Sequence, residues 1–114
     1  MAHAVIEALR KQIGGPRDGA LLRFSLGHAL LGIGDAAEAV DSLRAALVFD
    51  PHYSAAWKLL GQAQLQKNDP AAAIAAWQQG IGVATARGDT QAAKEMAVFL
   101  RRAQRTVSHD ALPD

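Results

Sequence analysis

Residues 57–77 read WKLLGQAQLQKNDPAAAIAAW, and the pattern of this stretch occurs once more 34 residues upstream. When the chain is shifted by 34 residues without a gap, the following positions are identical: Leu26 and Leu60, Gly27 and Gly61, Ala29 and Ala63, Leu31 and Leu65, Asp35 and Asp69, Ala37 and Ala71, Ala39 and Ala73. A repeat of this length is one supersecondary unit, which buries its apolar face against its neighbours. The sequence therefore predicts a stack of repeated units.

The composition fits a helical protein that folds without disulfide bonds or a structural metal ion. Half of the 114 residues are hydrophobic and a fifth are charged, which is unlike the composition of a disordered chain. A chain of this length can bury about two-thirds of its unfolded surface in one domain. Because there is no cysteine, a disulfide, a thiolate nucleophile and a cysteine-ligated metal are excluded. The formal net charge of +1 requires no polyanionic partner.

The sequence predicts neither a membrane span nor a leader peptide. A transmembrane helix needs a run of about 18 apolar residues or more, and no such run occurs. At the amino terminus, the basic pair Arg10 and Lys11 follows the apolar residues instead of preceding them. That order predicts a short amphipathic helix and not a signal peptide. We therefore expect a cytoplasmic protein without membrane contact.

Apolar periodicity, together with glycine and proline punctuation, predicts about six helices in a single domain over 1–107. The expected parts are an N-terminal helix at 3–13, repeat one at 20–53 with helices at about 18–31 and 36–49, repeat two at 54–87 with helices at about 54–67 and 70–87, a C-terminal capping helix at 90–106 and a disordered tail at 108–114. Polar residues before these helices predict N-caps, because their side chains accept a free backbone N–H. The expected caps are Asp18, Asp35 in a capping box with Glu38, Ser54, Asp69 before Pro70, and Asp89.

The repeat resembles the tetratricopeptide repeat, whose signature is W-x2-L-G-x2-Y, then A-x3-F, then P. Repeat two carries this signature at Trp57, Leu60, Gly61, Ala73 and Trp77, and repeat one carries it at Leu26, Gly27, Ala39, Leu43 and Pro51. Arg23 stands in the tryptophan position of repeat one, and Leu30 and Gln64 stand in the tyrosine position. The resemblance implies an all-α, right-handed stack of antiparallel helix hairpins. Gly61 and Ala73 are expected to be small because the two helices of a hairpin cross there.

The resemblance also implies a concave groove for ligands, lined by outward positions of the first helix of each unit. Carried over to this chain, the groove residues are Leu21, Phe24, His28 and Leu31 from repeat one, Ala55, Lys58, Gln62, Leu65 and Gln66 from repeat two, and Ala92, Met96 and Phe99 from the C-terminal helix. Several of these side chains are more apolar than a solvated surface requires. Family members that clamp a C-terminal carboxylate use a lysine–asparagine pair where this chain has Phe24 and His28, so that clamp is absent.

These residues predict a non-catalytic protein–protein interaction module that holds an apolar or amphipathic peptide or helix in the groove. Lys58 and His28 would fix the register of the ligand. The alternative is a structural scaffold subunit or homodimer that uses the same groove for self-association. The sequence does not name the partner.

Other chemistries find little support in the sequence. The four histidines, His3, His28, His52 and His109, lack metal-ligand spacing, so no metal, cofactor or catalytic site is expected. The cations Arg87, Lys94, Arg101, Arg102 and Arg105 lie close together in sequence. The chain as a whole is near neutral, which makes a solvated helix face a better interpretation than a nucleic-acid surface. Arg87-Gly88-Asp89 matches an adhesion tripeptide, but a helix stop followed by an N-cap explains it.

Overall fold

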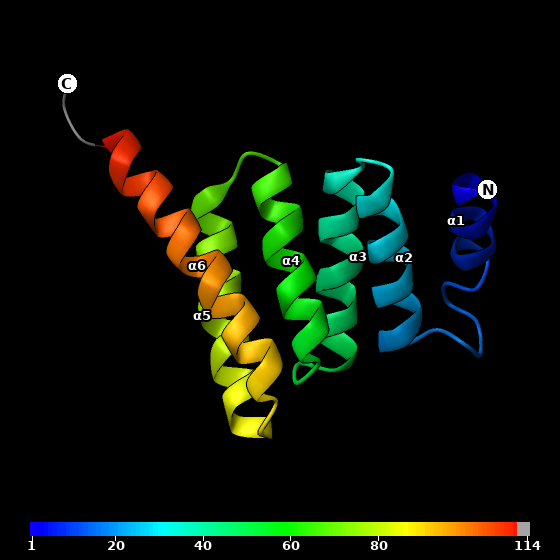
Figure 1. Ribbon diagram of the computed structural model, residues 1–114. Coiled ribbons are helices and arrows are strands. Elements are labelled where there is room, and N and C mark those ends of the chain that lie inside the picture. The colour runs from blue at the N-terminus through cyan, green and yellow to red at the C-terminus, as the bar shows by residue number, and fades with distance from the viewer. Residues whose placement is uncertain (112–114) are drawn as a thin grey trace.

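The computed structural model describes residues 1–111, with side chains for residues 1–108, and the described chain is all-α. Its helices are α1 (Ala2–Arg10), α2 (Ala20–Gly32), α3 (Ala36–Phe49), α4 (Ser54–Gln66), α5 (Pro70–Arg87) and α6 (Thr90–Ala111). Figure 1 shows α2 to α5 side by side in one row, with α1 at one end and α6 crossing obliquely at the other. Helices α1 and α6 therefore lie at opposite ends of an elongated body of 52 × 33 × 20 Å. The predicted fold class is confirmed.

The helices pack as two hairpins with a common inner side. Within each hairpin, α2 packs on α3 and α4 packs on α5. The first helices of successive units also touch, α2 with α4 and α4 with α6, whereas α3 and α5 make no contact in the described part of the chain. Because α2, α4 and α6 lie closer to one another than the second helices do, they line the concave side of the stack. We call this side the concave face.

Three predicted aspartate caps are confirmed, but Glu38 does not complete the capping box with Asp35, because its carboxylate binds Arg10. Each aspartate carboxylate accepts a hydrogen bond from the backbone N–H three residues further on: Asp35 from Glu38 at 3.2 Å, Asp69 from Ala72 at 3.1 Å and Asp89 from Ala92 at 3.2 Å. Gly88 ends α5 in the left-handed conformation, which glycine adopts without steric cost. These residues fix the ends of the hairpins.

Two other predicted caps are wrong. Asp18 does not cap α2, whose N-cap is Gly19. The Asp18 carboxylate instead binds the Arg23 guanidinium at 2.8 and 3.0 Å and accepts the backbone N–H of Gly14 at 2.8 Å. Ser54 does not cap α4, because it is already the first helical residue and follows the N-cap Tyr53. Its hydroxyl is buried and has no hydrogen-bond partner among the described atoms.

Two helix ends differ from the sequence prediction. The first helix ends at Arg10, and residues 11–13 form turns in which Gln12 and Ile13 donate to carbonyl groups three residues back. The last helix continues to Ala111. Residues 108–111 are therefore helical and not disordered, since no glycine or proline interrupts the chain between Thr90 and Ala111. The rest of the expected tail, 112–114, lies outside the described residues.

The hairpins are held together where a glycine of one helix faces a large side chain of the other. A Cβ atom added to Gly61 would lie 2.1 Å from Trp77 Nε1, and one added to Gly27 would lie 2.7 Å from Leu43 Cγ. Trp77 is buried, and its indole N–H donates to the Lys58 carbonyl oxygen at 3.1 Å. The other signature residues are also buried, except Trp57, which is half-buried, and Pro51, which is exposed.

A third close approach brings α6 against α5. A Cβ atom on Gly80 would lie 2.5 Å from Met96 Sδ and 2.6 Å from Trp57 Cβ. Gly82 has nothing within 4 Å of its Cβ position. Of these two glycines of α5, Gly80 alone lets α6 approach closely.

Candidate protein-binding face

The concave face contains a first hollow between α1, α2 and α4, which we call the N-terminal hollow. Its volume is about 530 Å³, and it is lined by Val5, Leu9, Phe24, Ser25, His28, Ala29, Ala55, Lys58 and Leu59. The Phe24 ring stacks on Tyr53 with centroids 4.8 Å apart and on His28 at 6.4 Å. These contacts hold Phe24 in place as one apolar wall, while His28 and Lys58 supply polar groups.

A second hollow, which we call the C-terminal hollow, lies between α4, the start of α5 and the distal half of α6. Its volume is about 400 Å³, and it is lined by Gln62, Leu65, Pro70, Trp77, Phe99, Arg102, Ala103 and Thr106. The Phe99 ring packs on Trp77 with centroids 5.6 Å apart. The hollow therefore has an aromatic base, an aliphatic wall at Leu65 and one cation, Arg102.

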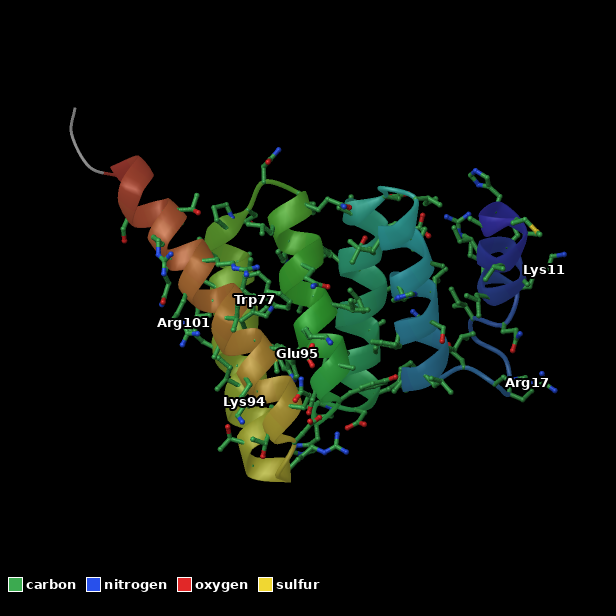
Figure 2. The ribbon with its side chains drawn as sticks, viewed as in Figure 1. Lys11, Arg17, Trp77, Lys94, Glu95 and Arg101 are labelled. Atoms are coloured by element: carbon green, nitrogen blue, oxygen red, sulfur yellow. The ribbon has the colours of Figure 1, made fainter. Side chains whose placement is uncertain are left out.

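An ion pair stands between the two hollows. Lys58 Nζ on α4 lies 2.9 Å from Glu95 Oε2 on α6, and Figure 2 shows Glu95 between these two helices. The hydrogen bond from Lys58 is the main reason that the pKa of Glu95 is lowered, with a smaller contribution from the side chain of Gln91. Both partners are partly exposed, so a ligand on this face can reach them.

The hollows bring together seven of the twelve predicted groove residues. Phe24, His28, Ala55 and Lys58 line the N-terminal hollow. Gln62, Leu65 and Phe99 line the C-terminal hollow. The sequence interpretation missed Val5 and Leu9, whose only signal was their shared face on the first helix, because their contribution depends on how α1 docks.

The other five predicted groove residues line neither hollow, and one of them, Ala92, is buried. Met96 was placed in the groove wrongly, since it is fully buried between α5 and α6, against Gly80. The face of α6 that carries Met96 turns toward α5 because Gly80 leaves room for its sulfur. Leu31 is half-buried against the core, while Leu21 and Gln66 are exposed outside the hollows.

The described residues offer no evident place for a metal ion. They contain no group of three or more histidine, aspartate or glutamate side chains arranged to hold one. His3 and His28 lie on separate helices and His52 lies in the α3–α4 turn, and the side chain of His109 is outside the described set. Across residues 1–111, no helix is long and apolar enough to cross a lipid bilayer.

A row of antiparallel helix hairpins with an apolar concave face defines a helical-repeat protein. Comparison with known proteins identifies the repeat. A family model described as tetratricopeptide repeat matches residues 2–53 and 24–89. The chain therefore belongs to the tetratricopeptide repeat family, as the signature residues indicated.

Two similar proteins match this chain over nearly their whole length, and two solved structures share its fold. A TPR repeat-containing protein of Pseudomonas aeruginosa is 48% identical over 101 residues, which cover 89% of this chain and 96% of that protein. The solution structure of a protein from Bordetella parapertussis is 40% identical and superposes with a TM-score of 0.80 over 96% of both chains. The crystal structure of MamA, at 21% identity, has a TM-score of 0.65 over 93% of this chain and 68% of its own, and shows the same fold. Proteins with this repeat generally act as protein–protein interaction modules.

Proposed function

We propose that the concave face binds an apolar or amphipathic segment of another protein and that the chain acts without catalysis. The observation that carries this proposal is that two apolar hollows open on the same face of the stack. Binding sites are typically concave and apolar, with a few polar groups that orient the ligand. His28, Lys58 and Arg102 are such groups here.

Exposed apolar side chains next to the hollows support the proposal. Leu65 is 45% exposed and Val5 is 53% exposed, and each lines one of the hollows. Apolar surface that is contiguous with a hollow is a common mark of a protein-binding site. A ligand that covers both side chains removes this surface from water.

The spacing of the hollows sets the length of the ligand. Ala55 lines the N-terminal hollow and Leu65 lines the C-terminal hollow, both on α4. Ten residues of helix span about 15 Å. A helical ligand that fills both hollows therefore needs about three turns, with apolar anchors at its two ends and a polar middle opposite Lys58 and Glu95.

Site-specific photocrosslinking in the native cell tests the proposal. A photoreactive residue is placed at His28 or Gln62, which are equivalent positions of the two repeats on the concave face. The controls are Arg44 and Gln78, which are equivalent to each other and exposed on α3 and α5. We expect the same partner protein to be trapped at both concave positions and not at the controls.

The result that would overturn the proposal is equal trapping at all four positions, or none at any. A covalent dimer of this chain formed only through His28 and Gln62 would instead support self-association through the concave face. The four variants keep the signature residues intact, so differences in folding do not explain differences in trapping.

A further inference from the structure

The C-terminal hollow has a cationic wall on its α6 side. Arg102 lines the hollow. Arg105, which is exposed and does not itself line the hollow, follows three residues later, one turn along the helix. Neither forms an ion pair with any described residue. The sequence of α6 has no acidic residue between Glu95 and Asp110. The positive charge on this wall is therefore not neutralised along α6 beside the hollow.

The charges on the other walls leave this cationic wall dominant. Glu95 is paired with Lys58, and neither of them lines the hollow. Asp69 precedes Pro70 on the α5 side, and its carboxylate accepts the first-turn N–H of Ala72. A carboxylate at a helix N-terminus is offset by the positive end of the helix dipole.

The shape of the hollow fits a helix face with a projecting anchor. Figure 1 shows α6 running obliquely across α4 and α5. The Lys58–Glu95 pair joins α4 and α6 at one end, and the hollow lies between the same helices further along. Trp77 and Phe99 form its base, so the deepest part receives an apolar side chain.

We propose that the C-terminal hollow binds an acidic amphipathic helix, whose apolar anchor fills the hollow and whose carboxylates pair with Arg102 and Arg105. This inference rests on the proposed function and names the chemistry of the partner. Arginine suits such a surface because its planar guanidinium binds carboxylates with two parallel hydrogen bonds. The charges give the partner its specificity and orientation, while the anchor supplies apolar burial.

Other occupants fit this surface less well. A lipid bilayer requires several apolar side chains that project outward, but among the described residues of α6 Val107 is the only large apolar one that is exposed. A nucleic acid would use the arginines but leave the apolar hollow unfilled. A second copy related by a two-fold axis through the hollow would bring the arginines of both copies together.

A displayed library of random peptides about 14 residues long, or four helical turns, tests the inference on the full chain. The library is selected on the wild type and on the double variant Arg102→Glu with Arg105→Glu. The matched control is Lys94→Glu with Arg101→Glu, which makes the same change in charge on the same helix. Neither control residue lines the hollow, and Figure 2 shows Arg101 on the side of α6 away from α4.

We expect peptides selected on the wild type to carry aspartate or glutamate beside apolar anchors. Reversal of Arg102 and Arg105 should weaken their binding by roughly tenfold or more, and the control by less than about twofold. Backbone amide shifts should concentrate at Gln62, Leu65 and Phe99. Calorimetry and NMR titration measure these effects.

Three results would overturn the inference. The selected peptides could lack an excess of acidic residues, both double variants could weaken binding equally, or the shifts could map outside the C-terminal hollow. If the wild type selects no peptide but binds phosphatidylglycerol vesicles or an oligonucleotide, the surface belongs to a membrane or a nucleic acid. Trapping of a partner protein at Gln62 would then still support the proposed function. Failure of this inference can therefore be distinguished from failure of the proposed function.

Discussion

The two hairpins solve one packing problem with different side chains. In α2–α3 the crossing glycine, Gly27, faces the flexible side chain of Leu43, whereas in α4–α5 Gly61 faces the rigid indole of Trp77. The tryptophan position of the signature, four residues before each glycine, also differs between the repeats. Trp57 donates its indole N–H to the Pro51 carbonyl oxygen at 2.9 Å. The equivalent Arg23 pairs with Asp18.

The difference follows from what each hairpin packs against. Trp57 contacts both core clusters of the protein, one formed by the first hairpin with α4 and the other by α5 with α6. It therefore joins the two halves of the stack. Arg23 lies near the end, where α1 covers the first hairpin, and its guanidinium lies 5.9 Å from the Phe49 ring centre. The tryptophan position of the signature therefore connects two core clusters in repeat two, whereas in repeat one it is partly exposed to solvent near the end of the stack.

The largest effect is expected at the rigid crossing. Gly61→Ala places a methyl group where the Trp77 indole lies and should lower the free energy of unfolding by about 2–3 kcal/mol, since a packed core resists added volume. Gly27→Ala should cost only about 1 kcal/mol, because Leu43 can change rotamer. Urea unfolding of both variants measures the difference. An equal cost at the two glycines would contradict the comparison.

Replacing the indole should make the two crossings alike. In a Trp77→Leu background, Gly61→Ala should cost about 1 kcal/mol less than in the wild type, because contacting residues are energetically coupled. Gly27→Ala serves as the distant control and should cost the same in both backgrounds. Additive costs for residues 61 and 77 would show that their contact does not limit packing.

The helix caps should give equal and smaller effects in the two repeats. Asp35→Ala and Asp69→Ala each remove one carboxylate that accepts a first-turn N–H. Each substitution should cost about 1 kcal/mol, which thermal unfolding can resolve. A cost confined to one repeat would show that its second helix is held by packing and not by its cap.

The smallest effect is expected at the edge, and it should depend on pH. The Arg23 side chain, followed by the Gly14 backbone N–H, holds the pKa of Asp18 well below its ordinary value of 3.8. The carboxylate therefore stabilises the fold above that value, and the stabilisation is lost as the pH falls below it toward the folded-state pKa. Asp18→Asn should remove this acid-sensitive part of the stability.

The control for this pH effect is Asp41→Asn. Asp41 is exposed on α3 and forms no ion pair with the described residues. Urea midpoints at about pH 7 and about pH 3 should differ less in Asp18→Asn than in the wild type and in the control. If the midpoint changes equally with pH in all three proteins, the Asp18–Arg23 pair does not stabilise this end of the stack.

The repeat period and the turn chemistry were enough to predict the fold. Glycine, proline and aspartate act over a few residues, so the starts of α3, α5 and α6 followed from local sequence. Asp18 was misjudged because an aspartate before a helix can either cap it or pair with a side chain, and Arg23 lies five residues away. The end of α6 was misjudged because a polar tail was taken as disordered although no residue before Pro113 breaks a helix.

The candidate site was predictable only in part, since it depends on how helices dock. Repeat register predicted that Phe24, His28, Lys58, Gln62 and Leu65 share one face. It could not show that α1 adds Val5 and Leu9, because α1 lies outside the two repeats and its position does not follow from their alignment. It also could not show that Met96 turns inward, because that rotation is set by the contact with Gly80 on another helix.

The central claim is that the signature residues build the stack, while the residues between them on the concave face bind the partner. Leu65→Gln tests it most directly, because Leu65 lines the C-terminal hollow and is substantially exposed. Partner crosslinking is measured through a photoreactive residue at position 62, with and without this substitution. The stability of both proteins is measured by urea unfolding. We predict that the crosslink is lost while the free energy of unfolding stays within about 0.5 kcal/mol of the wild type. An undiminished crosslink would contradict the claim.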